Sequence, residues 1–185
     1  MLIFFKKTYV KRDLQKKLNN PLTGWFGQKE QFKFSIEHEP AKGIVQFLTG
    51  TPPIFSIAPI EIGVDISLQA GIAKIRNKSV KQTSYFIELA KELLFPLGVS
   101  LNSPENSDLR GAHVSLGHRE GYAIDRALIN EMKVVPDFRH PNNIRYGMAP
   151  LYTTFEDIHH AVTRTQTVLT EKLYKKYSKA ITGVT

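Results

Sequence analysis

The chain has 185 residues, a net charge of +8 and no cysteine. This length suits one domain or two small ones with a real core, and no apolar run reaches the roughly eighteen residues of a membrane-spanning helix. Because cysteine is absent, disulfides and thiolate chemistry are excluded, which fits a cytoplasmic location.

The positive charge is concentrated at the two ends of the chain. Residues 1–17 carry a net +5 and residues 171–185 a net +3, so the residues between them are neutral. A nucleic-acid-binding domain instead has basic residues on one face of its fold, interleaved with aromatic residues. The pattern therefore argues against a nucleic-acid partner. Residues 1–5 are apolar but are followed, not preceded, by basic residues, so they do not predict a signal peptide.

The first part of the chain is predicted to be rich in loops. Residues 8–18 have a short helical pattern, which residues 19–21 stop with two asparagines and a proline. Trp25, the only tryptophan, follows in a loop between Gly24 and Gly27. An indole is a large apolar group with one N–H donor. Trp25 therefore either fills a core, which its position alone favours, or donates a hydrogen bond to a ligand.

Thr51 lies at the predicted start of a helix. A short apolar strand is expected at residues 47–48, and two prolines after Thr51 are expected to open a helix, because proline is tolerated in the first helical turn. The Thr51 hydroxyl near the N-cap then has two possible interpretations. It either caps the helix or binds an anion at the positive end of the helix, and capping is the simpler interpretation. The helix itself, residues 54–76, has apolar residues on several faces and is expected to be largely buried.

The rest of the chain alternates helical and strand patterns. Helices are expected at residues 78–95 and 122–132 and after Thr154, where a capping box with Asp157 begins the last helix. Strands are expected at residues 99–101, 110–118, 134–138 and 144–148. From about residue 98 the order is strand, strand, helix, strand, strand, helix. This order predicts an α+β fold, a small and mainly antiparallel sheet covered by helices.

Arg145 is the strongest candidate for a binding residue. Ile144, Tyr146 and Met148 alternate with Arg145 and Gly147, a period of two. Arg145 therefore points away from the apolar set, and Gly147 leaves room beside it. A guanidinium in such a place can bind a carboxylate or phosphate with two parallel hydrogen bonds. The alternative is an ordinary arginine on an exposed strand face.

The histidines do not predict a metal site. His113 and His118 are five positions apart, so on one strand they face opposite sides. His159 and His160 are adjacent on a helix and diverge by about 100°. With no cysteine and no acidic residue at ligand spacing, zinc is not expected.

Four motifs carry a resemblance to a known family; they lie at residues 24–27, 49–54, 110–116 and 138–152. In this order and spacing they resemble the C-terminal part of kynureninase, a pyridoxal-phosphate enzyme of the aspartate-aminotransferase fold (fold type I). Kynureninases hydrolyse L-kynurenine or 3-hydroxykynurenine to anthranilate or 3-hydroxyanthranilate and L-alanine, in tryptophan catabolism and NAD biosynthesis. The resemblance implies two parts: residues 1–75 as the end of the large α/β domain with a linking helix, and residues 76–185 as the small C-terminal domain.

The resemblance also implies roles for three residues. Trp25 would donate its indole N–H to the phosphate of pyridoxal 5'-phosphate. Thr51 would bind the same phosphate, across the interface of a homodimer. Arg145 would hold the α-carboxylate of the substrate.

The family's catalytic lysine is missing from the chain. These enzymes need a lysine that forms a Schiff base, an acid at the pyridine nitrogen and a phosphate cradle, and in the family all of these precede the matched region. The family's motif Tyr-Lys followed by Asn-Gly-Gly is absent, and Lys6 and Lys7 lack its context. We therefore expect the C-terminal part of a kynureninase, arising by truncation, frameshift or as a split subunit, with no catalytic residue of its own and no activity alone.

Two functions stay open at this point. One is an enzyme part that supplies Trp25, Thr51 and Arg145 to an upstream chain, with kynurenine as the small-molecule substrate and neither a nucleic-acid nor a membrane partner. The other is a non-catalytic remnant or interaction domain of the same fold. A neighbouring reading frame that ends in the lysine motif would favour the first, and its absence would favour the second.

Overall fold

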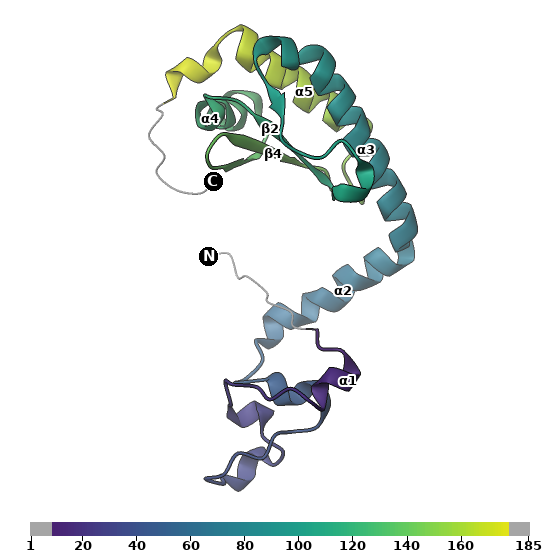
Figure 1. The fold of residues 1–185 in the computed structure, drawn as a ribbon, viewed down its shortest axis with the longest axis vertical. Coiled ribbons are helices and arrows are strands. Elements are labelled where there is room, and N and C mark those ends of the chain that lie inside the picture. Colours follow the sequence, from purple (N-terminus) through teal and green to yellow (C-terminus); the bar gives the residue numbers. More distant parts are fainter. Residues whose placement is uncertain (1–8, 178–185) are drawn as a thin grey trace. The chain divides into compact units, whose positions relative to one another are not determined.

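The computed structural model describes residues 9–177 of the chain (Figure 1). The apolar residues 1–5 and the basic pair Lys6 and Lys7 lie outside this part. By its contacts the chain divides into two compact units, Met1–Ile66 and Ser67–Thr185.

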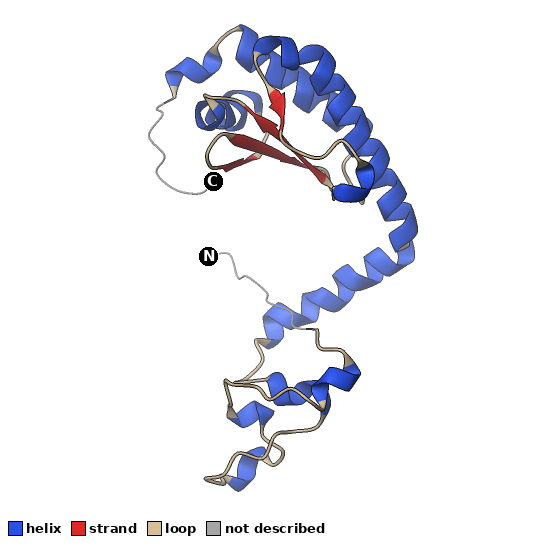
Figure 2. Cartoon of the chain, in the orientation of Figure 1, coloured by secondary structure: helices blue, strands red, loops and turns tan. Residues whose placement is uncertain are grey.

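The second unit is built on a four-stranded antiparallel sheet with helices packed on one face (Figure 2). The strands, in the spatial order β1-β2-β4-β3, are β1 (Ser100–Leu101), β2 (His113–Gly117), β4 (Asn143–Gly147) and β3 (Asp137–Arg139). The covering helices are α3 (Ile72–Leu93), α4 (Gly121–Met132) and α5 (Phe155–Thr170). The predicted α+β class and element order are confirmed. β3 is shorter than the strand expected at residues 134–138, since Pro136 has no N–H for a strand ladder.

The core lies between one face of this sheet and the helices. Val114 and Leu116 of β2 and Ile144 and Tyr146 of β4 are buried, and they pack with Phe86 and other apolar residues of α3, α4 and α5. In β4 and in residues 113–116 of β2 every second residue is buried, so the alternation predicted for these strands is confirmed. Each large apolar side chain buried in this way stabilises the fold by about 1.5–3 kcal/mol.

The predicted capping box begins α5. The Thr154 hydroxyl accepts the N–H of Asp157 at 3.0 Å, and the Asp157 carboxylate accepts the N–H of Thr154 at 2.8 Å. The helix buries Ile158 on its inner side. Phe155 is 41% exposed. As the first residue of the helix it lies at the rim of the core, where its ring contacts Tyr85 edge to face.

The first unit has little regular structure. Its described elements before α2 are α1 (Arg12–Gln15) and three 3-10 turns, Trp25–Gly27, Gln31–Lys33 and Gly43–Phe47. The helix expected over residues 8–18 is reduced to α1, because Leu14 and Leu18 stay exposed and a short helix without packing is marginal. The strand expected at residues 47–48 is also wrong, since a 3-10 turn ends there.

The long helix predicted for residues 54–76 is two helices. α2 (Ile54–Ala70) ends before Gly71, whose φ of +79° breaks the helix, and α3 begins beyond it. The expected burial is also wrong, because the described part of the chain buries no residue of α2 and Phe55 is 97% exposed. Between residues 9 and 177 no single helix is long and apolar enough to cross a membrane; the bent pair of α2 and α3 meets the criterion by length and composition alone.

Candidate active-site residues

The face of the sheet opposite the core is polar. The strand register places His113 opposite Gly147, and it places both Ser115 and Asp137 opposite Arg145. Residues paired across antiparallel strands project to the same side of the sheet. These five residues therefore share one face, and Arg145 lies at its centre between β2 and β3.

Arg145 has the orientation that its sequence pattern predicts. Its neighbours in the strand, Ile144 and Tyr146, are buried in the core, while the Arg145 side chain is 39% exposed on the other face. A Cβ built on Gly147 would have no atom within 4 Å. The open space expected on this face at Gly147 is therefore present.

Asp137 is the functional neighbour that sequence reasoning missed. Its Oδ2 forms an ion pair with Nη2 of Arg145 and accepts the Nε–H of Arg139 at 3.0 Å. The spacing of residues in the hairpin could have predicted this neighbour. Asp137 and Arg139 are two positions apart on one strand, so their side chains lie on the same face. Their strand then pairs with the strand of Arg145 across a short turn. A hairpin register worked out from that turn would have placed Asp137 beside Arg145.

Hydrogen bonds fix the strands that carry Arg145. The Ser115 hydroxyl donates to Oδ1 of Asn143 at 3.2 Å, and the Asn102 amide donates to the same oxygen at 2.7 Å. The backbone N–H of Ser115 donates to the hydroxyl of Ser103 at 2.8 Å. These contacts hold β2 and β4 in register on the polar face, directly beside Arg145.

Glycines bring the loop of Trp25 against the segment that leads to Thr51. A Cβ on Gly24 would lie 1.9 Å from the carbonyl oxygen of Thr49, and a Cβ on Gly27 would lie 2.5 Å from that of Leu48. Only glycine allows these two backbones to approach so closely. Trp25 and Thr51 thus belong to neighbouring segments of the first unit.

Trp25 does not fill a core. Its indole is 45% exposed, and its ring packs edge to face on Phe26 and Phe32 with centroids 5.0 and 5.6 Å apart. Within the described residues the indole N–H has no hydrogen-bond partner. The interpretation as a core residue is therefore wrong, and the donor is free to meet a ligand.

Thr51 does not cap α2. The carbonyl of Pro53 accepts the N–H of Ile57 at 3.0 Å, so Pro53 occupies the N-cap position and both prolines precede the helix rather than form its first turn. Thr51 lies two residues earlier with an exposed side chain, and its hydroxyl has no hydrogen-bond partner in the part of the chain that the structure describes. The capping interpretation is wrong, whereas the hydroxyl is available to a ligand.

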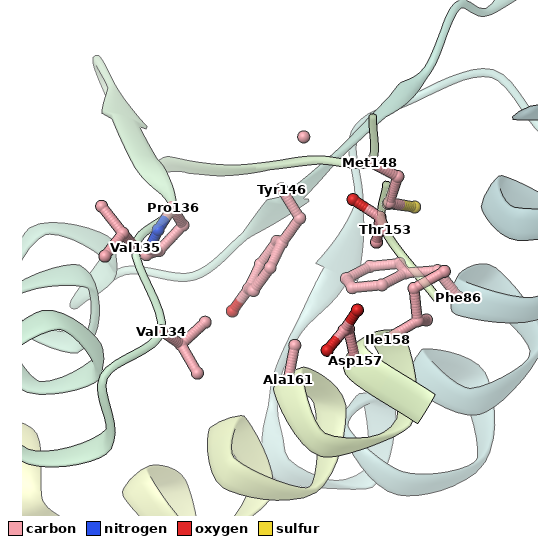
Figure 3. A pocket seen from close by; sticks show the side chains of 11 residues that line it. Phe86, Val134, Val135, Pro136, Tyr146, Met148, Thr153, Asp157, Ile158 and Ala161 are labelled. Atoms are coloured by element: carbon pink, nitrogen blue, oxygen red, sulfur yellow. The ribbon is translucent and has the colours of Figure 1, made fainter. Parts of the chain in front are cut away.

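A separate pocket of about 170 Å³ lies on the core side of β4 (Figure 3). Most of its walls are apolar, from Phe86, Val134, Tyr146 and Met148. Its acidic group, Asp157, already accepts the hydrogen bonds of the capping box. No positive side chain lines the pocket, so it does not suit an anionic substrate.

Asp125 of α4 is a buried carboxyl group away from the polar face. It is 0% exposed, and neither carboxylate oxygen has a hydrogen-bond partner among residues 9–177. Burial raises the pKa of Asp125 to about 7, against an opposing effect of Arg126 and a further small rise from Asp137. The group lies in a closed core, so we interpret it as a cost to stability. Residues 9–177 also contain no group of three histidine, aspartate or glutamate side chains that could hold a metal ion.

Comparison with known proteins shows which family the second unit is similar to. Residues 75–165 match the family described as the kynureninase C-terminal domain. The chain is 41% identical over 154 residues to the kynureninase of Pseudomonas fluorescens, an alignment that covers 83% of this chain and 37% of the relative. It is 38% identical over 159 residues to the kynureninase of Geobacillus thermodenitrificans, covering 85% of this chain and 37% of the relative. The chain thus spans between a third and two fifths of the length of these kynureninases.

Solved structures with a similar fold extend over both units. A cysteine desulfurase from Thermococcus onnurineus NA1 matches with a TM-score of 0.70 at 17% identity, covering 88% of this chain and 42% of the other. The cystine C-S lyase C-DES matches with a TM-score of 0.69 at 19% identity, covering 85% of this chain and 41% of the other. At such identities the likeness concerns the fold alone. The fold that the resemblance implied, the C-terminal part of fold type I, is therefore confirmed.

Proposed function

Because the chain carries the C-terminal domain of the kynureninase family, we propose that it supplies Trp25, Thr51 and Arg145 to an active site that an upstream chain completes. The reaction of that site is the hydrolysis of L-kynurenine or 3-hydroxykynurenine to anthranilate or 3-hydroxyanthranilate and L-alanine. Arg145 carries the proposal, as a half-exposed guanidinium beside a bare glycine on the polar face of the sheet.

Arg145 binds and orients the substrate in this proposal. Its guanidinium holds the α-carboxylate by parallel hydrogen bonds, a geometry that the point charge of lysine does not reproduce. Each hydrogen bond to a charged group contributes about 1.5–3 kcal/mol. The space beside Gly147 leaves the rest of the amino acid free to reach the reacting groups of the other chain.

Trp25 and Thr51 suit the phosphate of pyridoxal 5'-phosphate. Each offers a donor without a partner in the described residues, and the two segments that carry them are in contact through Gly24 and Gly27. When bound, this cofactor acts as an electron sink for carbanion chemistry. The two donors hold its phosphate and so orient it, whereas the lysine that binds it covalently has to come from the upstream chain.

The proposal includes a location and partners. We place the protein in the cytoplasm, as one half of a kynureninase that pairs with an upstream chain and assembles as a homodimer of such pairs. Without the upstream chain it should neither hold the cofactor covalently nor turn over kynurenine.

The test is purification of the chain with and without the part of a kynureninase that precedes the matched region, for example from the Pseudomonas fluorescens enzyme. With it, we expect absorbance of protein-bound cofactor and release of anthranilate from L-kynurenine. The chain alone should show neither. A borohydride-stable cofactor adduct at one lysine of the chain alone, together with anthranilate release, would contradict the proposal.

A second function is favoured by α2. Its exposed apolar residues, with Phe55 97% exposed, suit an interaction domain that binds a protein partner without catalysis. In the same experiment this function predicts a stable complex with the upstream part that lacks turnover. It also predicts that Arg145→Lys has no effect on any measured property of that complex.

A further inference from the structure

We propose that Asp137 is a positioning residue for Arg145, and that Arg139 anchors Asp137 in turn. This inference rests on the proposed function, in which Arg145 binds the carboxylate of the substrate. It adds two residues that do not contact the substrate but determine the position and orientation of the Arg145 guanidinium.

The three side chains form one chain of contacts on the polar face. Nη2 of Arg145 contacts Oδ2 of Asp137, and the same oxygen lies 3.0 Å from Nε and 2.9 Å from Nη2 of Arg139. The strand register places Asp137 opposite Arg145, so the contact follows from backbone pairing. A long arginine side chain is thereby held at a point defined by the sheet.

Most N–H donors of the Arg145 guanidinium are available to a ligand. A guanidinium has five N–H donors, and among the described residues the only acceptor of Arg145 is Asp137, at Nη2. The remaining donors have no acceptor among the described residues, and the polar face is open at Gly147, two residues along the same strand. A planar carboxylate can therefore be held bidentately while Asp137 keeps its contact.

Arg139 keeps Asp137 in place. Oδ2 of Asp137 accepts one N–H from each of the two arginines and also lies 2.9 Å from Nη2 of Arg139 as an ion pair, whereas Oδ1 is buried and has no hydrogen-bond partner among residues 9–177. Two positive groups on one carboxylate leave the cluster with a net positive charge. An arriving carboxylate is therefore attracted to Arg145, and Asp137 stays paired with Arg139.

The direction in which Kd changes when Asp137 is replaced distinguishes a positioning role from a purely electrostatic one. If Asp137 acted only as a negative charge, its removal would strengthen the binding of an anion at Arg145. If it orders the arginine, its removal weakens binding, because the free side chain has to be immobilised when the ligand binds. The loss of ordering corresponds to a rise in Kd of about three- to ten-fold.

The experiment titrates L-kynurenine into the full 185-residue chain and follows the NMR signals of the Gly147 amide and the Arg145 Nε–H. We expect Asp137→Asn, which keeps the shape of the side chain, to raise Kd. Arg139→Lys should raise Kd to a smaller extent, because it keeps the charge and loses the second contact. The matched control is Glu105→Gln, which removes one negative charge from an exposed pair with Lys91 and should leave Kd unchanged.

The change in Kd tests the positioning role of Asp137. A lower or unchanged Kd in Asp137→Asn overturns the positioning role, and an unchanged thermal unfolding curve shows that the variant is folded. If neither the wild-type chain nor its complex with the upstream part binds L-kynurenine, the proposed role of Arg145 fails. Hydrogen exchange at the Nη2 hydrogens of Arg145 still tests the pairing: faster exchange in Asp137→Asn supports it, and equal exchange overturns it.

Discussion

Replacement of Asp125 by leucine should stabilise the protein at neutral and alkaline pH. The wild-type carboxyl group is fully buried in α4, and neither oxygen has a hydrogen-bond partner within the described residues. Leucine has the same number of side-chain heavy atoms, branched at the same carbon, and needs no hydrogen-bond partner. The substitution therefore removes a buried polar group without opening a cavity.

The magnitude follows from the pKa of Asp125. Burial raises this pKa from 3.8 to about 7, so the folded protein holds the proton more tightly than the unfolded chain. The contribution of the protonated group is complete below about pH 4 and is lost as the pH rises towards 7. At about 1.4 kcal/mol per pKa unit, and with allowance for solvent screening, the wild-type protein loses about 2–4 kcal/mol.

The assay is urea unfolding of wild type and Asp125→Leu, followed by circular dichroism at pH 4.5 and at pH 8. We expect the difference between the two proteins in free energy of unfolding to grow with pH by about 2–4 kcal/mol. Asp108→Asn, at an exposed position, is the control and should follow the wild-type protein. A difference that is the same at both pH values would refute the reasoning, because the carboxyl group would then be equally easy to ionise in both states.

Three further outcomes are expected. In the enzyme completed by an upstream chain, Arg145→Lys should lower kcat/KM for L-kynurenine about ten-fold or more with unchanged cofactor absorbance. Trp25→Phe should instead weaken the binding of the cofactor before it affects the substrate. Loss of cofactor in Arg145→Lys would contradict this assignment of roles. Amide hydrogen exchange should show protection concentrated in residues 98–175, and equal protection of residues 20–50 in the monomer would contradict this. Thr154→Ala should lower the free energy of unfolding by about 0.5–2 kcal/mol in a urea titration, because it removes the cap of α5; Thr170→Ala, near the other end of the helix, is the comparison.

Several features of the protein were determined by local sequence. The alternation of apolar and polar residues around Arg145 defined a strand with one buried face, because successive side chains point to opposite sides. Thr154 and Asp157 marked the start of α5, because a capping box involves only residues three apart. The four motifs also led to the family, since their order and spacing are properties of the chain alone.

The predictions that failed are those in which distant parts of the chain decide. Residues 54–76 have a continuous helical pattern, but Gly71 adopts a positive φ and no described residue buries α2. Trp25 has a large apolar side chain of the kind that fills a core. In the first unit, however, the backbone at Gly24 and Gly27 packs against the backbone of residues 46–49, and the Trp25 side chain stays half exposed. Burial depends on what covers a residue, and periodicity does not contain that information.

Only the tertiary structure decided the surroundings of Arg145. Its contact with Asp137 depends on the pairing of β3 with β4, and the position of Ser115 beside it depends on the pairing of β2 with β4. The sequence alone determined that an arginine faces away from the core with room beside it. Which groups hold that arginine is a matter of strand register, because a shift of one residue would turn every partner to the other face.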